Sequence, residues 1–203
     1  MSPRVGLFDY GSGNLHSAAR AFENAGAEVT VSGDLEALRR QDALVVPGVG
    51  AFEACMSALV QAGGADLIRD WAAADRPLFG ICVGHQVLFD GGEEHGAQTE
   101  GVGLYPGRVT QLAARRLPHM GWNTVDAPEG SELFRGLNGS RFYFVHSYAA
   151  HPWEGDARVA TCTVEEDTFV AAVERGSVVS TQFHPEKSGA SGARLLRNWI
   201  ATV

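Results

Sequence analysis

The sequence has 203 residues, of which 45% are hydrophobic and 20% are charged, and its formal net charge at pH 7 is -8. This length and this balance predict one globular domain spanning residues 1–203 and exclude a disordered chain. The acidic charge argues against nucleic acid as a partner, because such a surface repels phosphate groups.

The cysteines and the N-terminus indicate a reducing compartment. Cys55, Cys82 and Cys162 are too few for a disulfide framework, and none forms the CxxC pair of a structural zinc site. The N-terminal residues lead directly into a strand-like run and lack the features of a signal peptide. Since no segment approaches the ~20 apolar residues that span a bilayer, we expect a cytoplasmic protein without membrane contact.

The first half of the chain alternates between strand and helix patterns. Short apolar runs predict buried strands, and apolar residues at helical spacing predict helices that bury one face. The expected strands cover residues 5–8, 29–31, 43–46 and 77–81, and the expected helices cover residues 14–25, 52–73 and 82–89. Asp34 would cap a further short helix, and Gly91 and Gly92 would end the helix over 82–89. The alternation predicts an α/β fold with a mostly parallel central sheet flanked by helices.

The second half is richer in strand and turn patterns. Residues 101–111 are hairpin-like, strands are expected at 141–145, 158–164, 169–173 and 177–183, and a final helix is expected at 189–200. These strands predict antiparallel additions to the parallel sheet. The sequence has no internal repeat, low-complexity tract or linker.

Cys82 lies between a predicted strand and a predicted helix, with Gly80 and Gly84 on either side. Small neighbours permit the sharp turn that lifts a nucleophile above a sheet. The amides at the start of the following helix would favour the thiolate. The amide of Val83 would face the oxyanion that forms at an attacked carbonyl. The alternative is a buried and inert cysteine, which is common for free thiols.

His184 and Glu186 follow the predicted strand 177–183. In extended geometry they project to the same side, so the carboxylate can orient an imidazole that accepts the thiol proton. Taken alone, the pair could be two unrelated surface residues. Beside the turn at Cys82, and also at the carboxyl end of a strand, it predicts a Cys-His-Glu triad. His146 is kept outside this set because it could be a hydrogen-bonded core residue.

Residues 47–50, Pro-Gly-Val-Gly, follow another strand at the same edge of the sheet. Gly48 and Gly50 would let the backbone approach a substrate or rotate. The amide of Val49 is therefore a candidate for the second oxyanion donor, although the fragment alone could be a plain strand-to-helix turn.

Together these segments resemble the class I, triad-type glutamine amidotransferases over essentially the whole chain. The resemblance implies a flavodoxin-like fold and hydrolysis of glutamine to glutamate and ammonia, with Cys82 as nucleophile, His184 as acid and base, and Glu186 orienting the imidazole. It implies that glutamine is bound by Gly48, Gly50, Gln86, Glu94, Ser147 and Tyr148. His85 departs from the methionine or leucine expected at its position. No GxGxxG follows a strand and no metal-ligand cluster appears in the sequence, so we expect neither a cofactor nor a metal.

Four further segments resemble one branch of that family, the glutaminase subunits of imidazole glycerol phosphate synthase. They are residues 9–15, 118–123, 143–148 and 182–188, and Pro-His-Met-Gly-Trp-Asn at 118–123 is the most discriminating. The branch implies a heterodimer with a (β/α)8-barrel cyclase subunit. The cyclase would use the ammonia to make imidazole glycerol phosphate and AICAR in histidine biosynthesis. By the same likeness the residues at the partner interface are Asn14, His119, Met120, Trp122 and Lys187.

Three other functions compete with this reading. A glutaminase that serves another synthase is disfavoured by residues 118–123 and by the lack of a fused synthetase domain. A cysteine peptidase on a similar sheet is disfavoured by Gln86 and Glu186. A non-catalytic binding module is disfavoured by the complete triad, whereas Trp122 could still be an ordinary core aromatic.

Overall fold

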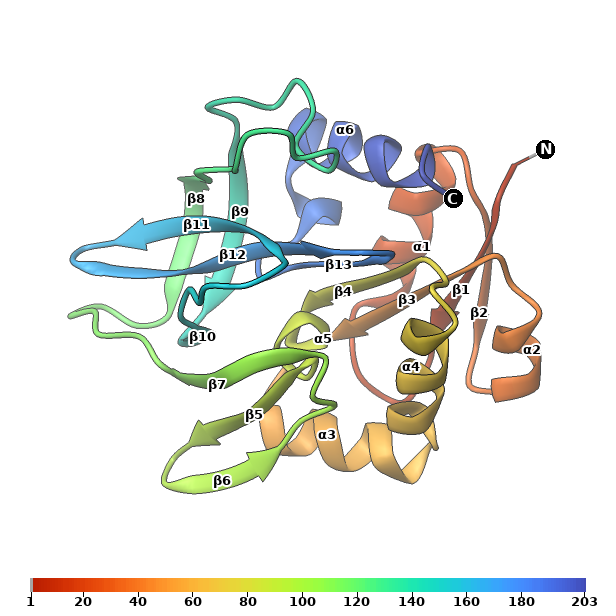
Figure 1. Cartoon of the computed structure of the whole chain (residues 1–203), viewed down its shortest axis with the longest axis horizontal. Helices are drawn as coiled ribbons and strands as arrows, with labels where there is room; N and C mark the ends of the chain where they lie inside the picture. Colours follow the sequence, from red (N-terminus) through yellow and green to blue (C-terminus); the bar gives the residue numbers. More distant parts are fainter. Residues whose placement is uncertain (1) are drawn as a thin grey trace.

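The computed structural model describes residues 2–203 and is built around a seven-stranded sheet (Figure 1). The strand order is β11-β12-β13-β4-β3-β1-β2. The strands are β1 (Arg4–Phe8), β2 (Glu28–Ser32), β3 (Ala43–Gly48), β4 (Leu78–Cys82), β11 (Arg158–Val164), β12 (Asp167–Arg175) and β13 (Val178–Thr181). Neighbours from β13 to β2 run parallel, and β12 pairs antiparallel with β11 and β13. This confirms the predicted α/β fold with antiparallel strands from the second half.

Helices cover both faces of this sheet (Figure 1). They are α1 (Leu15–Asn24), α2 (Leu35–Arg39), α3 (Phe52–Gln61), α4 (Gly64–Ala73), α5 (Val83–Gln86) and α6 (Gly189–Ile200). On one face Phe22 of α1, Phe79 of β4 and Trp199 of α6 pack their rings edge to face, with centroids 5.2–5.9 Å apart. Every residue of β3 and β4 is buried, as expected for strands that are covered on both sides.

Two predicted helices differ in the structure. The helix expected over 52–73 is interrupted after Gln61, because Gly63 adopts φ of 70°, which ends α3 before α4 begins. The helix expected over 82–89 is wrong beyond Gln86: the chain enters strand β5 (Phe89–Glu94). Gly91 and Gly92 lie inside that strand and do not end a helix. A Cβ at Gly92 would lie 2.7 Å from the ring of Phe52, so this glycine allows α3 to pack closely on β5.

The hairpin expected over 101–111 is also wrong. The hairpin is formed by β5 and β6 (Ala97–Glu100), whereas β7 (Tyr105–Gln111) pairs parallel with β5. With β10 (Tyr148–Ala150) these strands make a four-stranded sheet in the order β10-β7-β5-β6. The carboxyl ends of β3 and β4 point toward this second sheet (Figure 1).

A further antiparallel pair is formed by β8 (His119–Thr124) and β9 (Arg141–His146). Strand β8 was not predicted from the sequence. Its exposed and half-buried residues alternate, so that Met120, Trp122 and Thr124 face outward. Within residues 2–203, no helix has the length and apolar character needed to cross a membrane.

Candidate active site

The strand register brings the three predicted segments side by side. Gly48, at the end of β3, is paired with Cys82 at the end of β4. On the other side of β4, Thr181 of β13 is paired with Ile81, and the chain continues from there to His184. The Pro-Gly-Val-Gly segment, the cysteine turn and the histidine segment therefore share the carboxyl edge of the main sheet, where active sites of parallel sheets form.

The turn at Cys82 is sharp and depends on its glycines. Cys82 has φ of 56° and ψ of −112°, which is unusual for a residue with a side chain. A Cβ at Gly84 would collide with the carbonyl of Val46, and one at Gly80 would lie 2.7 Å from the carbonyl oxygen of Gly84. Helix α5 has only four residues. It therefore offers backbone N–H groups at its start but little of the macrodipole of a longer helix.

His184 lies between Cys82 and Glu186. Its Nδ1 is 2.7 Å from Oε1 of Glu186, and both side chains are only 4% exposed. The extended geometry expected for this pair is wrong, because residues 185–187 form a 3₁₀ turn, η1 (Pro185–Lys187), that swings the carboxylate back to the ring. The backbone N–H of His184 donates to the carbonyl of Tyr143, so strand β9 helps to fix the imidazole.

The neighbours of His184 set its protonation. Burial lowers the pKa of the imidazole, but hydrogen bonds with Cys82 and Glu186, together with their charges, raise it by more, to about 9. The imidazole of His184 therefore favours its protonated form, in which Nδ1 donates to the carboxylate of Glu186.

Cys82 and His184 open into a cavity of about 240 Å³. Its walls contain most of the residues predicted to contact glutamine or the oxyanion, namely Val49, Gly50, Val83, Gln86, Glu94, Ser147 and Tyr148, and also Val145, His146 and Lys187. Gly48 lies outside this lining: its missing side chain lets the loop approach the turn, since a Cβ there would be 2.6 Å from the amide of Gly84. Glu186 lies behind His184.

Two predicted binding residues are held by other groups of the protein. Gln86 donates from Nε2 to the carbonyl of Tyr148 at 2.8 Å and to Oε1 of Gln182 at 2.9 Å. Its own carbonyl oxygen is thus the atom left for a ligand. Glu94 accepts from the amide of Phe52, the first residue of α3, at 2.8 Å. Gln182 was not predicted to have a role, although it opens the segment that contains His184.

The amide of Val49 is engaged by a residue that the sequence did not single out. The N–H of Val49 donates to Oγ of Ser12 at 3.0 Å, and that hydroxyl lies 3.0 Å from the carbonyl of Val49. The side chain of Val49 is 45% exposed. Ser12 therefore holds this peptide with its N–H on the hydroxyl, where it is not free to stabilise an oxyanion.

The predicted interface residues surround the rim of this edge. Met120 is 65% exposed and Trp122 46% exposed, both on the outward face of β8. Asn14 and Lys187 are exposed, and His119 is half-buried. Asn14 also caps α1, because its side chain accepts from the amide of Ser17.

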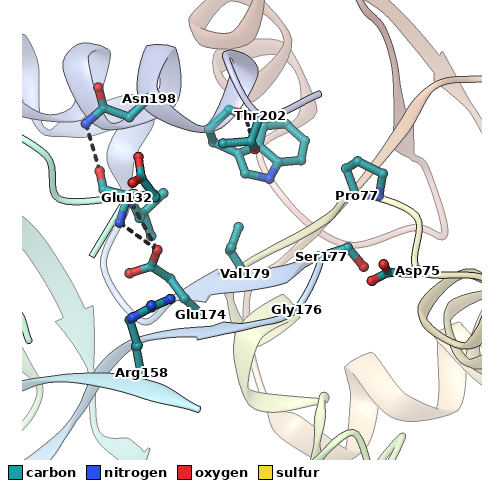
Figure 2. Close-up of a pocket in the computed structure, with 12 residues that line it drawn as sticks. Asp75, Pro77, Glu132, Arg158, Glu174, Gly176, Ser177, Val179, Asn198 and Thr202 are labelled. Carbon is teal, nitrogen blue, oxygen red and sulfur yellow. Dashed lines mark hydrogen bonds between the residues drawn. The ribbon is translucent and has the colours of Figure 1, made fainter. Parts of the chain in front are cut away.

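A second cavity, of about 410 Å³, lies at the opposite edge of the sheet. Asn198 and Thr202 bound it on one side, and Arg158 and Glu174 of the strands bound it on the other (Figure 2). Glu174 is already occupied by the amides of Glu132 and Leu133. The cavity contains neither a cysteine nor a histidine, so the smaller cavity at Cys82 is the candidate active site.

Comparison with known proteins agrees with this fold. The family model "Glutamine amidotransferase class-I" matches residues 6–203. The chain is 55% identical to the "Imidazole glycerol phosphate synthase subunit HisH" of Corynebacterium diphtheriae, covering 97% of this chain and 98% of that protein. It is 54% identical to the protein of the same name from Mycobacterium tuberculosis, covering 97% of this chain and 96% of that protein.

Solved structures show the same fold at low sequence identity. One described as a glutamine amidotransferase aligns with a TM-score of 0.77 at 20% identity, over 98% of this chain and 99% of that one. PurLQS from Thermotoga maritima aligns with a TM-score of 0.75 at 18% identity, over 100% of this chain and 99% of that one. The resemblance identified from the sequence motifs is thus confirmed: the chain belongs to the class-I glutamine amidotransferase family, among the HisH subunits of imidazole glycerol phosphate synthase.

Proposed function

We propose that this chain hydrolyses glutamine to glutamate and ammonia with a triad of Cys82, His184 and Glu186. The observation that carries the proposal is the position of His184, which is hydrogen-bonded to Glu186 and lines the same cavity as Cys82 at the carboxyl edge of the sheet. Glu186 orients the imidazole and stabilises its charge, which is the role that this arrangement gives a carboxylate in other triads.

In the proposed reaction His184 carries the thiol proton, and the Cys82 sulfur attacks the side-chain carbonyl carbon of glutamine. The tetrahedral adduct collapses when the C–N bond breaks and His184 gives its proton to the leaving nitrogen, releasing ammonia. A water molecule, deprotonated by His184, then attacks the thioester and releases glutamate. The amide of Val83 is one proposed donor to the oxyanion in both halves, and the amide of Val49 is the second once it has rotated away from the hydroxyl of Ser12.

Substrate contacts are proposed for the residues around the cavity. Glu94 pairs with the ammonium group of glutamine, for which a carboxylate is suited. Gln86 offers its carbonyl oxygen, and Ser147 and Tyr148 line the wall of the cavity beside it. Gly48 and Gly50 let the Val49 segment come close to the bound amide.

The ammonia is proposed to serve a second subunit. The relatives are named as subunits of imidazole glycerol phosphate synthase. We infer a heterodimer with a (β/α)8-barrel cyclase, which makes imidazole glycerol phosphate and AICAR in histidine biosynthesis, in the cytoplasm. The contact face includes Asn14, His119, Met120, Trp122 and Lys187. Exposed apolar side chains on neighbouring outward positions of β8 support this assignment.

Labelling with an electrophilic glutamine analogue tests the triad. The reagent is expected to add to Cys82 and not to Cys55 or Cys162, which serve as internal controls, as read by peptide mass spectrometry. Glutamine should slow the labelling. Equal labelling of all three cysteines, or no protection by glutamine, would contradict the assignment of the nucleophile.

Two variants test the division of roles. His184→Ala should lower kcat by several orders of magnitude, because loss of the base disables the whole unit. Glu186→Ala should cost less, since the carboxylate orients without transferring the proton. A Glu186 variant slower than the His184 variant would overturn this division.

A further inference from the structure

His119 and His146 face each other across the β8–β9 pair. Nδ1 of His119 lies 3.1 Å from Nε2 of His146. The other nitrogen of His146, Nδ1, lies 2.9 Å from the carbonyl oxygen of Tyr148. The other nitrogen of His119, Nε2, lies 3.4 Å from Nδ2 of Asn123, which is also 3.2 Å from the carbonyl oxygen of Thr163. The two rings thus connect β8 to the wall of the glutamine cavity.

The chemistry of the end groups fixes the direction of every hydrogen bond. A carbonyl oxygen only accepts, so His146 donates from Nδ1 to Tyr148. At the other end, Oδ1 of Asn123 accepts from the amide of Thr124, so Nδ2 of Asn123 faces His119 and donates to its Nε2. Because Nε2 of His119 accepts, its Nδ1 carries the proton and donates to Nε2 of His146. Each imidazole has one donor and one acceptor, which requires both rings to be neutral.

The surroundings keep the rings neutral. Burial is the main reason that the pKa of His146 is lowered to about 3; the hydrogen bond to the Tyr148 carbonyl opposes this effect, and the neighbouring rings of His119 and His184 add to it. Burial also lowers the pKa of His119. The rings of Phe144 and Phe169 lie 4.8–5.7 Å from these imidazoles, measured between centroids.

The carbonyl of Tyr148 has a second donor, Nε2 of Gln86, which also donates to Gln182. Gln86 is 4% exposed and Gln182 is fully buried. We propose that His146, oriented by His119, is a positioning residue for glutamine: its Nδ1–H fixes the Tyr148 carbonyl, which holds Gln86 with its free oxygen toward the substrate. This inference rests on the proposed glutaminase function and concerns a residue outside the triad.

Two substitutions of His146 distinguish a role as hydrogen-bond donor from a role in filling space. In His146→Asn, the amide nitrogen is bonded to Cγ, as Nδ1 is in histidine, and can still donate to Tyr148. In His146→Gln, the amide nitrogen lies one bond farther out, although the side chain is closer to histidine in length. The variants are compared by glutamine kinetics of the full chain with the cyclase subunit, and Thr124→Ala, on the outward face of β8, is the control.

The expected result is a KM for glutamine raised about tenfold (~1.4 kcal/mol) in His146→Gln, with kcat within about threefold, because one hydrogen bond is lost from the binding wall. His146→Asn should stay within about threefold of the parent KM, and Thr124→Ala should match the parent. A Gln variant that binds glutamine as well as or better than the Asn variant would overturn the proposal.

The hydrogen bond between the rings can also be observed directly. In 15N-labelled protein, a scalar coupling between Nδ1 of His119 and Nε2 of His146 is expected across the N–H···N bond, and it should vanish in both His146 variants. Absence of this coupling in the parent would overturn the proposal whether or not the chain hydrolyses glutamine. Loss of glutamine hydrolysis in the parent itself would instead refute the proposed function, so the two failures are distinguishable.

Discussion

Cys82 holds a backbone conformation that costs a side-chain-bearing residue about 1–3 kcal/mol, and its surroundings must supply that energy. The close approach of the α5 turn to β3 does so only while residue 84 has no Cβ. The strained backbone of Cys82 therefore depends on the close packing that Gly84 allows. A substitution of Gly84 should affect both stability and catalysis.

Gly84→Ala tests this coupling. The added Cβ would collide with the carbonyl of Val46, so the turn has to move. We expect the free energy of unfolding, measured in urea, to fall by about 2 kcal/mol or more and glutaminase activity to be lost. Gly155→Ala is the control, because its Cβ would be 3.4 Å from Trp153, an ordinary contact. Full activity in Gly84→Ala would contradict the close packing described here.

The protonation of His184 should be visible in the pH dependence of stability. Its pKa of about 9 in the folded chain exceeds the ordinary value of 6.5. The folded state therefore binds the proton more tightly, and the resulting stabilisation is fully present below about pH 6.5 and is lost as the pH rises through about 9. Between these values the free energy of unfolding of the parent should fall more steeply than that of His184→Gln. His16→Gln, at an exposed position, should keep the parent slope, and identical slopes for all three proteins would refute the raised pKa.

Ser12 should restrain basal activity. Its hydroxyl occupies the N–H of Val49, and one oxyanion donor is worth roughly 2.7–4 kcal/mol in such reactions. Ser12→Ala removes a hydrogen bond of roughly 0.5–1.5 kcal/mol that holds the peptide in this orientation. We expect glutamine hydrolysis by the isolated chain to rise about two- to tenfold, whereas Ser57→Ala, on the exposed side of α3, should leave it unchanged. A slower Ser12 variant would show that the hydroxyl supports catalysis instead.

Among the elements, β8 exposes two large apolar side chains at neighbouring outward positions, which makes it the best candidate for a partner contact. Met120 and Trp122 occupy neighbouring outward positions on it and are 65% and 46% exposed. Val60 on α3 is also exposed, at 58%, but lies on a different element. Binding of a partner should therefore be weakened by substitutions on β8 and not by equivalent substitutions on α3.

Met120→Asp should weaken binding of the cyclase subunit at least about tenfold, because a charge would be placed in an apolar contact. Val60→Asp is the matched control and should leave the Kd unchanged. Isothermal titration with the cyclase subunit gives both values, and glutamine binding by the free chain reports that each variant is folded. Equal effects of the two substitutions would place the interface elsewhere.

The helices and strands also show which parts of the fold could be predicted from the sequence. The main-sheet strands and α6 were predicted within a few residues because buried runs and helical periodicity are local signals. The strand at 89–94 was missed because its sequence, Phe-Asp-Gly-Gly-Glu-Glu, has one apolar residue and two glycines, which indicate the end of a helix more readily than a strand. Its identity depends on pairing with β7 and on Phe52 packing over Gly92, which are contacts distant in sequence.

The site shows the same division. Cys82, His184 and Glu186 could be placed because each follows a strand whose end is fixed by parallel topology. Ser12 and Gln182 could not be assigned roles, since their contacts with Val49 and Gln86 arise only from the packed loops. Strand β8 was hidden because its inward residues, His119 and Asn123, are polar and hydrogen-bonded to one another.

At the scale of the whole molecule, one core joins both halves of the chain. A single cluster of buried residues extends from Val5 of β1 to Trp199 of α6. We propose on this basis that residues 1–203 form one domain. Urea unfolding should then show one transition, with tryptophan fluorescence and far-UV circular dichroism coinciding. Separate midpoints for the two probes would contradict a single domain.

The central place of β4 has a consequence for the protein while it is being made. Cys82, the proposed nucleophile at the end of β4, precedes its proposed base, His184, by about 100 residues, and β13, which leads to His184, pairs with β4 from the far end of the sequence. At ~5–20 residues per second, a ribosome needs roughly 5–20 s to cover that interval. A nascent chain therefore contains Cys82 for several seconds before His184 has been synthesised. If Cys82 and His184 act as proposed, the chain cannot hydrolyse glutamine until β13 has been made and has paired with β4.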